Sequence, residues 1–288
     1  MKKITAMILA GMLAAGMVSG CSSGTEGEGG ASSGKGRYVE EDMELPLSDT
    51  EQAVNFTRSG EGNPLLFASD GTQVIRYEYR DGVWERTELV WTKSLVTGDA
   101  VTFEDAEETK DGMQYVMTVD NNTMQCTLSR QSADQAEADG GEKVELSYLE
   151  TESAYGYPLV YDIAVDPSGN YWLLDLMQGM VLAVDGETDE TLLEVPAELS
   201  LAASQKMLFQ GEDGRITFAT GEGEYTVYDS ASMEKVGSLN TDCSTENGYA
   251  LAADGENWYQ VSADGISRMR DGNDIEEVIM DGNSGAMG

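Results

Sequence analysis

Four short apolar runs between residues 160 and 195 decide the fold class of this chain. They read Val160-Tyr-Asp-Ile-Ala-Val165, Tyr171-Trp-Leu-Leu174, Val181-Leu-Ala-Val184 and Thr191-Leu-Leu-Glu-Val195. Short runs rich in β-branched and aromatic residues, bounded by turn residues, are typical of strands. The turn residues between the runs are Asp166-Pro-Ser-Gly169, Gln178-Gly179 and Asp185-Gly186. Such pairs supply the positive φ angles that tight hairpins need, so the stretch predicts a four-stranded antiparallel unit.

The same unit recurs on both sides of this stretch. We expect it at residues 53–91, 101–149, 206–239 and 249–280, with an exposed acidic, glutamine-rich insert near 131–143. The glycines of the first turns are Gly62, Gly112, Gly169, Gly214 and Gly255. Repeats of roughly 40–50 residues are the range of propeller blades, which stack radially because one meander cannot bury both of its faces. We therefore predict an all-β fold over residues 38–288, a β-propeller-like array of about five four-stranded blades. A twisted β-sandwich is the alternative.

The N-terminal residues 1–20 have the order of an export signal. Lys2 and Lys3 precede an uncharged stretch from Ile4 to Val18, which is shorter than the roughly 20 apolar residues of a spanning helix. The stretch ends at Val18-Ser-Gly-Cys21, which resembles the lipobox of bacterial lipoproteins. The resemblance implies that Cys21 receives a diacylglyceryl thioether and becomes the mature N-terminus. The alternatives are an ordinary signal peptide with a chance cysteine and a buried apolar helix.

Residues 21–37 follow as a predicted tether. After Cys21 they are rich in Gly and Ser and nearly devoid of apolar groups, so they cannot bury surface. We expect the lipid on Cys21 to hold the chain on the extracytoplasmic face of a cell membrane, with the tether lifting the folded part clear of the bilayer. Two or more acyl chains anchor a protein stably where one does not.

Composition excludes several functions. The chain has 53 acidic and 17 basic residues, a net charge of −36, and no histidine. Such a charge repels nucleic acid, and the lack of histidine excludes a Ser-His-Asp triad and removes the commonest transition-metal ligand. We predict no cofactor, no metal and no catalytic residues. Cys126 reads as a small buried hydrophobe, with a Cys126–Cys243 disulfide as the alternative.

Three kinds of residue remain candidates for chemistry. The Asp-rich turns at residues 166–170, 185–189 and 271–274 suggest calcium, but none has the EF-hand spacing, and turn chemistry accounts for their Asp, Asn and Gly. Carboxylate pairs such as Glu107-Glu108 and Glu276-Glu277 suggest a glycosidase but arise by chance in so acidic a chain. The equivalent positions of Trp172 and Trp258 favour blade packing over a sugar-stacking platform.

The lipobox, the tether, the opening Arg37-Tyr-Val-Glu-Glu-Asp-Met-Glu-Leu-Pro46 and the blade-like repeats together resemble a group of Gram-positive surface lipoproteins. Some members continue into a solute-binding domain of the ABC-transporter type. The resemblance implies a non-catalytic binding or scaffolding module, compatible with the front part of such a solute-binding protein, with an unidentified extracellular ligand or protein as partner. The alternative is a carbohydrate-active enzyme, a glycosidase or lyase, that uses carboxylates at a propeller channel.

The residues from Tyr38 to Pro46 alternate apolar and acidic side chains and read as a strand that closes a propeller ring. Each of the five later units already has four strands, so this strand has no incomplete blade to join. We therefore expect that the chain does not close a propeller by itself and that further blades belong to the complete protein. The alternative is a five-bladed ring with an added edge strand.

Overall fold

The structure is a computed structural model, and it describes residues 45–89, 101–132, 141–197, 208–210, 214–221, 224–240, 250–254, 257–262, 265–270 and 274–277. Side chains are described through residue 238, apart from 88–89 and 208–210. The predicted signal peptide, Cys21 and the tether lie outside these ranges, as do residues 38–44 of the predicted closing strand. Leu45 and Pro46 are described and belong to no strand. Within the described ranges, no helix is long and apolar enough to cross a membrane.

Almost all regular structure is β. The first eight strands are β1 (Gln52–Arg58), β2 (Pro64–Ser69), β3 (Val74–Arg80), β4 (Val83–Leu89), β5 (Val101–Glu108), β6 (Met113–Asp120), β7 (Gln125–Ser132) and β8 (Glu142–Lys143). A helical turn, α2 (Ser147–Glu150), precedes β9 (Val160–Val165), β10 (Tyr171–Asp175), β11 (Met180–Val184) and β12 (Thr191–Pro196). The remaining strands are β13 (Leu208–Gln210), β14 (Arg215–Gly221), β15 (Glu224–Asp229), β16 (Glu234–Asn240), β17 (Ala250–Asp254), β18 (Asn257–Ser262), β19 (Gly265–Arg270) and β20 (Asp274–Glu277).

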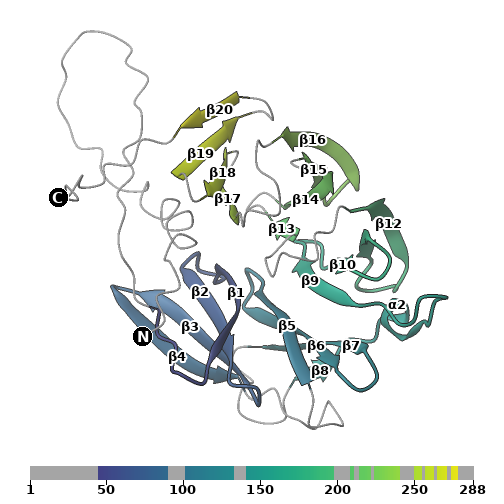
Figure 1. Cartoon of the computed structure of the whole chain (residues 1–288), viewed down its shortest axis with the longest axis horizontal. Coiled ribbons are helices and arrows are strands. Elements are labelled where there is room, and N and C mark those ends of the chain that lie inside the picture. The colour runs from purple at the N-terminus through teal and green to yellow at the C-terminus, as the bar shows by residue number, and fades with distance from the viewer. Residues whose placement is uncertain are drawn as a thin grey trace.

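Consecutive strands pair antiparallel in sets of four, β1–β4, β5–β8, β9–β12, β13–β16 and β17–β20. Figure 1 shows the sheets arranged around a common centre, with the first strand of each set nearest the centre and the fourth outermost. This is the propeller arrangement that the repeats predict, and the β-sandwich alternative is wrong.

The number of blades needs a correction. The structure shows four blades, β1 to β16, that pack against one another through described side chains, instead of the expected five or so. The strands β17–β20 pair in the same order, but only their backbone is described. The second blade also departs from the expectation, because its fourth strand, β8, has just two residues before the chain turns into α2. The apolar residues Val144, Leu146 and Leu149 leave the sheet there and cover the joint to the next blade.

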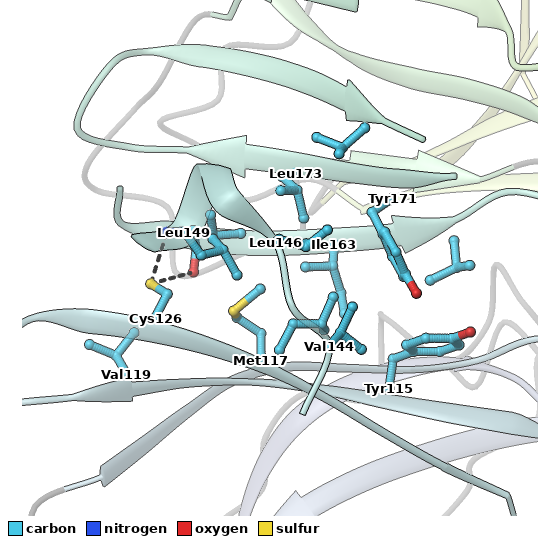
Figure 2. Packing of buried hydrophobic residues seen from close by; sticks show 14 residues of the cluster. Tyr115, Met117, Val119, Cys126, Val144, Leu146, Leu149, Ile163, Tyr171 and Leu173 are labelled. Carbon is cyan, nitrogen blue, oxygen red and sulfur yellow. Dashed lines mark hydrogen bonds between the residues drawn. The ribbon is translucent and has the colours of Figure 1, made fainter. Parts of the chain in front are cut away.

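The core lies between blades. The joint between the second and third blades buries Met117, Cys126, Leu128, Ile163 and Leu173 (Figure 2). The next joint, between the third and fourth blades, is built around Trp172 and Phe218, neither of which is exposed. Blade packing is therefore the role of Trp172, as the sequence predicts. Burying apolar faces in this way stabilises the folded state by roughly 25 cal/mol per Å² of apolar surface removed from water.

The first-turn glycines have the backbone conformation that their role requires. Gly62, Gly112, Gly169 and Gly214 have φ between 79° and 86°, a region that favours glycine. Gly186 differs from the expectation, because the positive φ of its turn belongs to Asp189 (60°). Gly186 is needed for another reason: a Cβ there would collide with the carbonyl oxygen of Gly169.

The β6–β7 turn differs in the same way, because its Asn121-Asn122 pair is of the kind that supplies positive φ in hairpins but does not supply it here. The residue with a left-handed backbone is Met124, at φ 58°. The turn is closed by the Met124 amide, which donates to the Asp120 carbonyl, while the Asp120 carboxylate accepts from the amides of Asn122 and Thr123. Aspartate therefore organises this turn from its first position, and its fifth residue takes the strained conformation.

Candidate functional site

The innermost strands of the first three blades share a bulge. The pairing register shifts between Ala53 and Asn55 in β1, between Phe103 and Asp105 in β5, and opposite Leu174 and Asp175 in β9. The residues left out of the ladder are Val54, Glu104 and Tyr161. Bulges re-aim the side chains around them and often lie beside functional sites. The repeated bulge therefore makes the inner strands around the centre of the molecule the candidate site.

The residue after each bulge is buried and polar: Asn55, Asp105 and Asp162. The Asn55 side-chain amide donates to the Ala106 carbonyl at 2.8 Å, from the first blade to the second. Asp105 accepts from its neighbour Ala106 at 2.8 Å and from the Ile163 amide of the third blade at 2.9 Å. The side chains of Asn55 and Asp105 therefore tie neighbouring blades together beside the bulges.

Glu104 and Tyr161 differ from these three residues because their side chains stay partly exposed. Burial raises the pKa of Glu104, so its carboxyl holds a proton more readily than an exposed glutamate does. Burial also raises the pKa of Tyr161, and the charges of Glu104, Asp162 and Asp105 add to that shift. The charge of Glu104 therefore acts on the Tyr161 phenol across the joint between the second and third blades.

The outer side of the same joint holds Cys126. Its sulfur accepts the Val160 amide at 3.3 Å and lies 3.9 Å from the Val160 carbonyl oxygen (Figure 2). Cys126 is buried and free, and Cys243, its partner in the disulfide alternative, lies outside the described residues. Burial raises the pKa of Cys126 to about 11. The buried, protonated thiol fits the predicted role of a small hydrophobe.

A further buried carboxylate, Asp175, ends β10 beside this cysteine. It accepts from the Tyr148 hydroxyl at 2.6 Å, from the Leu159 amide at 3.2 Å and from the Met177 and Gln178 amides. Burial and the charge of Asp175 raise the pKa of Tyr148, which keeps the phenol protonated as a donor. The Asp175 carboxylate thus joins three segments: α2, the residue before β9, and the β10–β11 turn.

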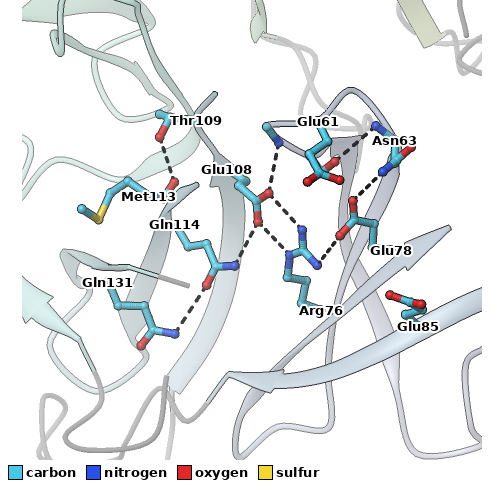
Figure 3. A network of polar contacts seen from close by, with 12 residues as sticks. Glu61, Asn63, Arg76, Glu78, Glu85, Glu108, Thr109, Met113, Gln114 and Gln131 are labelled. Atoms are coloured by element: carbon cyan, nitrogen blue, oxygen red, sulfur yellow. Dashed lines mark hydrogen bonds and ion pairs between the residues drawn. The ribbon is translucent and has the colours of Figure 1, made fainter. Parts of the chain in front are cut away.

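A second polar network joins the first two blades at the end where the β1–β2 and β5–β6 turns lie (Figure 3). The Arg76 guanidinium forms a two-point ion pair with Glu108, at 2.7 and 2.9 Å, and a third contact with Glu78 at 2.8 Å. Burial alone would raise the pKa of Glu78, but hydrogen bonds from Asn63, Ser59, Arg80 and Arg76 lower it to about 2. All three side chains are largely buried, so the network acts as a joint between blades.

The predicted carboxylate candidates have structural roles. Glu107 accepts from Asn55 and Thr57 of the first blade, and Glu108 belongs to the Arg76 network, so this pair joins blades. The side chains of Glu276 and Glu277 lie outside the described residues. Neither pair is brought to a shared cleft by the described side chains.

The described carboxylates of the candidate calcium turns accept hydrogen bonds from protein donors, and Asp189 accepts from the Ser147 amide outside its turn. Asp166 accepts from the amides of Ser168 and Asn170 and from the indole N–H of Trp172. Asp185 accepts from the Glu187 and Thr188 amides. Only Asp274 of the third turn is described, and by its backbone alone. Across the described ranges, no three acidic or cysteine side chains gather as a metal site would require.

Comparison with solved structures supports the fold. The extracellular domain of a candidate one-component system of B. thetaiotaomicron matches with a TM-score of 0.52 at 14% identity, over 83% of this chain and 31% of that protein. A streptogramin B lyase matches with a TM-score of 0.51 at 14% identity, over 83% of this chain and 72% of the lyase. A protein of unknown function from Bacteroides caccae matches with a TM-score of 0.51 at 13% identity, over 81% and 83% of the two chains.

These similarities define the class of this chain as a β-propeller protein and nothing narrower, because identities this low show the fold alone. The chain spans about a third of the length of the first of these structures. No family model matches the sequence, and no curated protein matches it. The predicted lipidation residue, Cys21, lies outside the described residues. Sequence reasoning missed Glu104 and Tyr161, because a bulge leaves no mark in an alternating pattern. The residue that follows each bulge is polar and buried, but β1 and β5 carry other polar residues too, so the sequence does not single it out.

Proposed function

We propose that this protein is a lipid-anchored, extracytoplasmic β-propeller that acts as a non-catalytic binding or scaffolding module. The observation that carries the proposal is the use of its buried carboxylates. Asp105, Asp166 and Asp175 each accept two or more hydrogen bonds from protein donors. Carboxylates engaged in this way hold turns and blades in place, and a rigid propeller presents its loops as a binding surface.

The location in this proposal rests on the lipobox-like Val18-Ser-Gly-Cys21 and the Gly/Ser-rich tether. A module of the solute-binding kind held at the membrane surface needs both an anchor and a reach beyond the headgroups. A net charge of −36 keeps such a surface soluble and away from anionic lipid and nucleic acid.

The test is metabolic labelling with a tagged fatty acid in a Gram-positive host. We expect the wild-type chain to carry the label, to sediment with membranes and to be digested by a protease added to intact cells. Cys21→Ala should carry no label and should be released or remain unprocessed. Cys126→Ala is the matched control, because it removes a cysteine outside the lipobox. Equal membrane retention of Cys21→Ala and the wild type would contradict the proposal.

Glu104 favours a second candidate function, a carbohydrate-active enzyme that acts as a glycosidase or lyase. A half-buried carboxyl with a raised pKa, beside the phenol of Tyr161, is suited to protonate a leaving group. This function is tested by assaying the chain against chromogenic glycosides and uronic-acid polysaccharides. If the chain is such an enzyme, Glu104→Gln should lower its rate roughly a hundredfold or more, while the exposed control Glu187→Gln should leave it unchanged. If neither the glycosides nor the polysaccharides are turned over, the second candidate function is contradicted and the binding module remains as the proposed function.

A further inference from the structure

We propose that the end of the second and third blades that carries Met124, Tyr155 and Met177 docks a cationic, apolar peptide segment of a partner protein. This inference rests on the proposed binding function and names its surface and its partner class. The described residues include six large apolar side chains that are at least 40% exposed. Three of them, Val83, Leu192 and Val236, are scattered over the outermost strands β4, β12 and β16. The other three gather at one end of the molecule.

Backbone and sulfur contacts show that these three residues share an end. Cys126, two residues after Met124, binds Val160 through its sulfur. Val160 begins β9 and pairs with Asp175, two residues before Met177. Tyr155 lies in the loop that leads into β9, and the Leu159 carbonyl of that loop accepts from the Leu176 amide at 2.9 Å. The β6–β7 turn and the β10–β11 turn therefore meet at the start of β9, where the loop that carries Tyr155 ends.

The three apolar side chains at this end are exposed to solvent. Met124 is 49% exposed, Tyr155 73% and Met177 45%. Methionine adapts its shape to a partner, and tyrosine supplies a large amphipathic contact at low entropic cost, so both are enriched at interfaces. The Asp175 contacts to Leu159, Met177 and Gln178 hold the two supporting segments rigid. A rigid base with adaptable tips is the arrangement that binds a partner without first having to order itself.

Met124 also keeps an unfavourable backbone. Its φ of 58° lies where the equivalent residue of the β10–β11 turn is Gly179, at 65°. In both turns the backbone N–H of this residue donates a hydrogen bond to the carbonyl oxygen of the aspartate four positions earlier. A non-glycine residue with this left-handed backbone destabilises the fold by roughly 1 kcal/mol, and an exposed methionine side chain makes few contacts that offset this cost. Met233 closes the β15–β16 turn with the same backbone, at φ 57°, but its side chain packs against the core, whereas the Met124 side chain is exposed.

Charge selects the partner. Residues 120–124, 150–159 and 175–179 contain no lysine or arginine. Asp120 and Glu152 are the acidic residues whose charge faces this end, because Asp175 is buried and Glu150 is paired with Lys143. An apolar patch with acidic neighbours attracts a segment that carries lysine or arginine beside apolar side chains, and it repels a second copy of this chain, whose net charge is −36. The segment that fits is therefore cationic and apolar.

The test uses the full chain with Cys21→Ser, which needs no detergent, and a fluorescent peptide of alternating lysine and leucine. Two comparison peptides replace leucine with serine or lysine with glutamate. We expect the lysine–leucine peptide to bind more tightly than both at physiological salt. Met124→Gly combined with Tyr155→Ser should weaken that binding about tenfold or more. The matched control is Val83→Ser combined with Val236→Ser, which removes exposed apolar side chains from the outer strands and should leave the affinity unchanged.

Met124→Gly alone separates docking from folding. Glycine relieves the left-handed strain, so the thermal midpoint should stay the same or rise while the peptide affinity falls. Equal affinity of the wild type, the patch variants and the control variants would overturn the proposal, because it would show attraction by net charge only. No binding of the lysine–leucine peptide would overturn it as well. Either result leaves the anchored-module proposal standing, because fatty-acid labelling at Cys21 tests that proposal separately.

Discussion

The carboxylate of Asp105 accepts the backbone N–H of Ile163 at 2.9 Å, and this bond joins the inner strands of two neighbouring blades. Asp105 directly follows Glu104, the bulged residue of β5. Asp162 is the equivalent residue of β9, and Ile163 comes next after it. Asn55 reaches the second blade from the corresponding position of β1. A propeller blade has few backbone hydrogen bonds to its neighbours. Near the centre these side-chain hydrogen bonds hold the blades together, and farther out apolar packing does so.

Asp105→Ala should destabilise the protein by about 2–4 kcal/mol, because it leaves two buried amide groups, those of Ala106 and Ile163, without an acceptor. Urea denaturation followed by tryptophan fluorescence measures the change. Glu187→Ala removes an exposed carboxylate and should change stability by less than about 0.5 kcal/mol. A similar small change for Asp105→Ala would show that the bond contributes nothing.

Arg76→Met should cost about 3–5 kcal/mol, because it leaves Glu108 as a buried charge without its cation and leaves Glu78 with Arg80 alone. The matched control is Arg130→Met, whose exposed ion pair with Glu142 should contribute about 1 kcal/mol or less. Urea denaturation at pH 7 compares the two variants. If both variants lose the same stability, burial of the Arg76 network is without consequence.

The Glu78 carboxylate makes stability depend on pH. Its pKa falls from an ordinary value of 4.5 to about 2 in the folded protein, so its contribution is complete above 4.5 and is lost as the pH falls toward 2. Glu78→Gln should therefore be less stable than the wild type at pH 7, and the difference should shrink steadily between pH 4.5 and pH 2. A difference that stays constant with pH would contradict this role.

Glu104 should show the opposite dependence. Burial raises its pKa, so the folded protein binds the proton more tightly than the unfolded chain, and the stability that this provides is lost as the pH rises through the raised pKa. Glu104→Gln is expected to be at least as stable as the wild type at pH 7 and to lose that advantage near pH 4. Thermal midpoints measured across this range decide the point, and a clear loss of stability at pH 7 would refute it.

Cys126 should react slowly while the protein is folded. A pKa of about 11 lowers its thiolate fraction at pH 8 roughly a hundredfold relative to an ordinary cysteine, and its burial hinders access as well. Iodoacetamide labelling followed by peptide mass spectrometry should modify Cys126 at the normal rate in urea only. Rapid labelling of Cys126 in the native protein would show that the joint between the second and third blades opens readily.

Gly186→Ala should cost about 1–3 kcal/mol, because the added methyl group meets the Gly169 carbonyl and the two turns must separate. Gly221→Ala is the matched control, since a Cβ there lies at an ordinary 3.5 Å from the Glu224 side chain. Thermal unfolding of the two variants gives the comparison. Equal midpoints would mean that the β9–β10 and β11–β12 turns can move apart without cost.

The sequence by itself determined the strands, their sets of four and the left-handed glycines of the first turns. These features are local, because alternation, turn residues and the freedom of Gly62, Gly112 and Gly169 act over a few neighbouring positions. The same local reasoning predicts the lipidation of Cys21, which stays a prediction. It misplaced the positive φ at residues 122 and 186, because a turn of five residues moves the strain to its last member, Met124 or Asp189.

Only the tertiary structure decided which side chains meet. The bonds from Asp105 to Ile163 and from Arg76 to Glu108 span 58 and 32 residues, and no pattern along the chain encodes them. The gathering of Met124, Tyr155 and Met177 at one end follows from the radial stacking of blades, because stacking brings equivalent turns of successive repeats side by side. Contacts between blades depend on how whole sheets pack, and that packing is settled by the summed burial of many side chains and not by the propensity of any one segment.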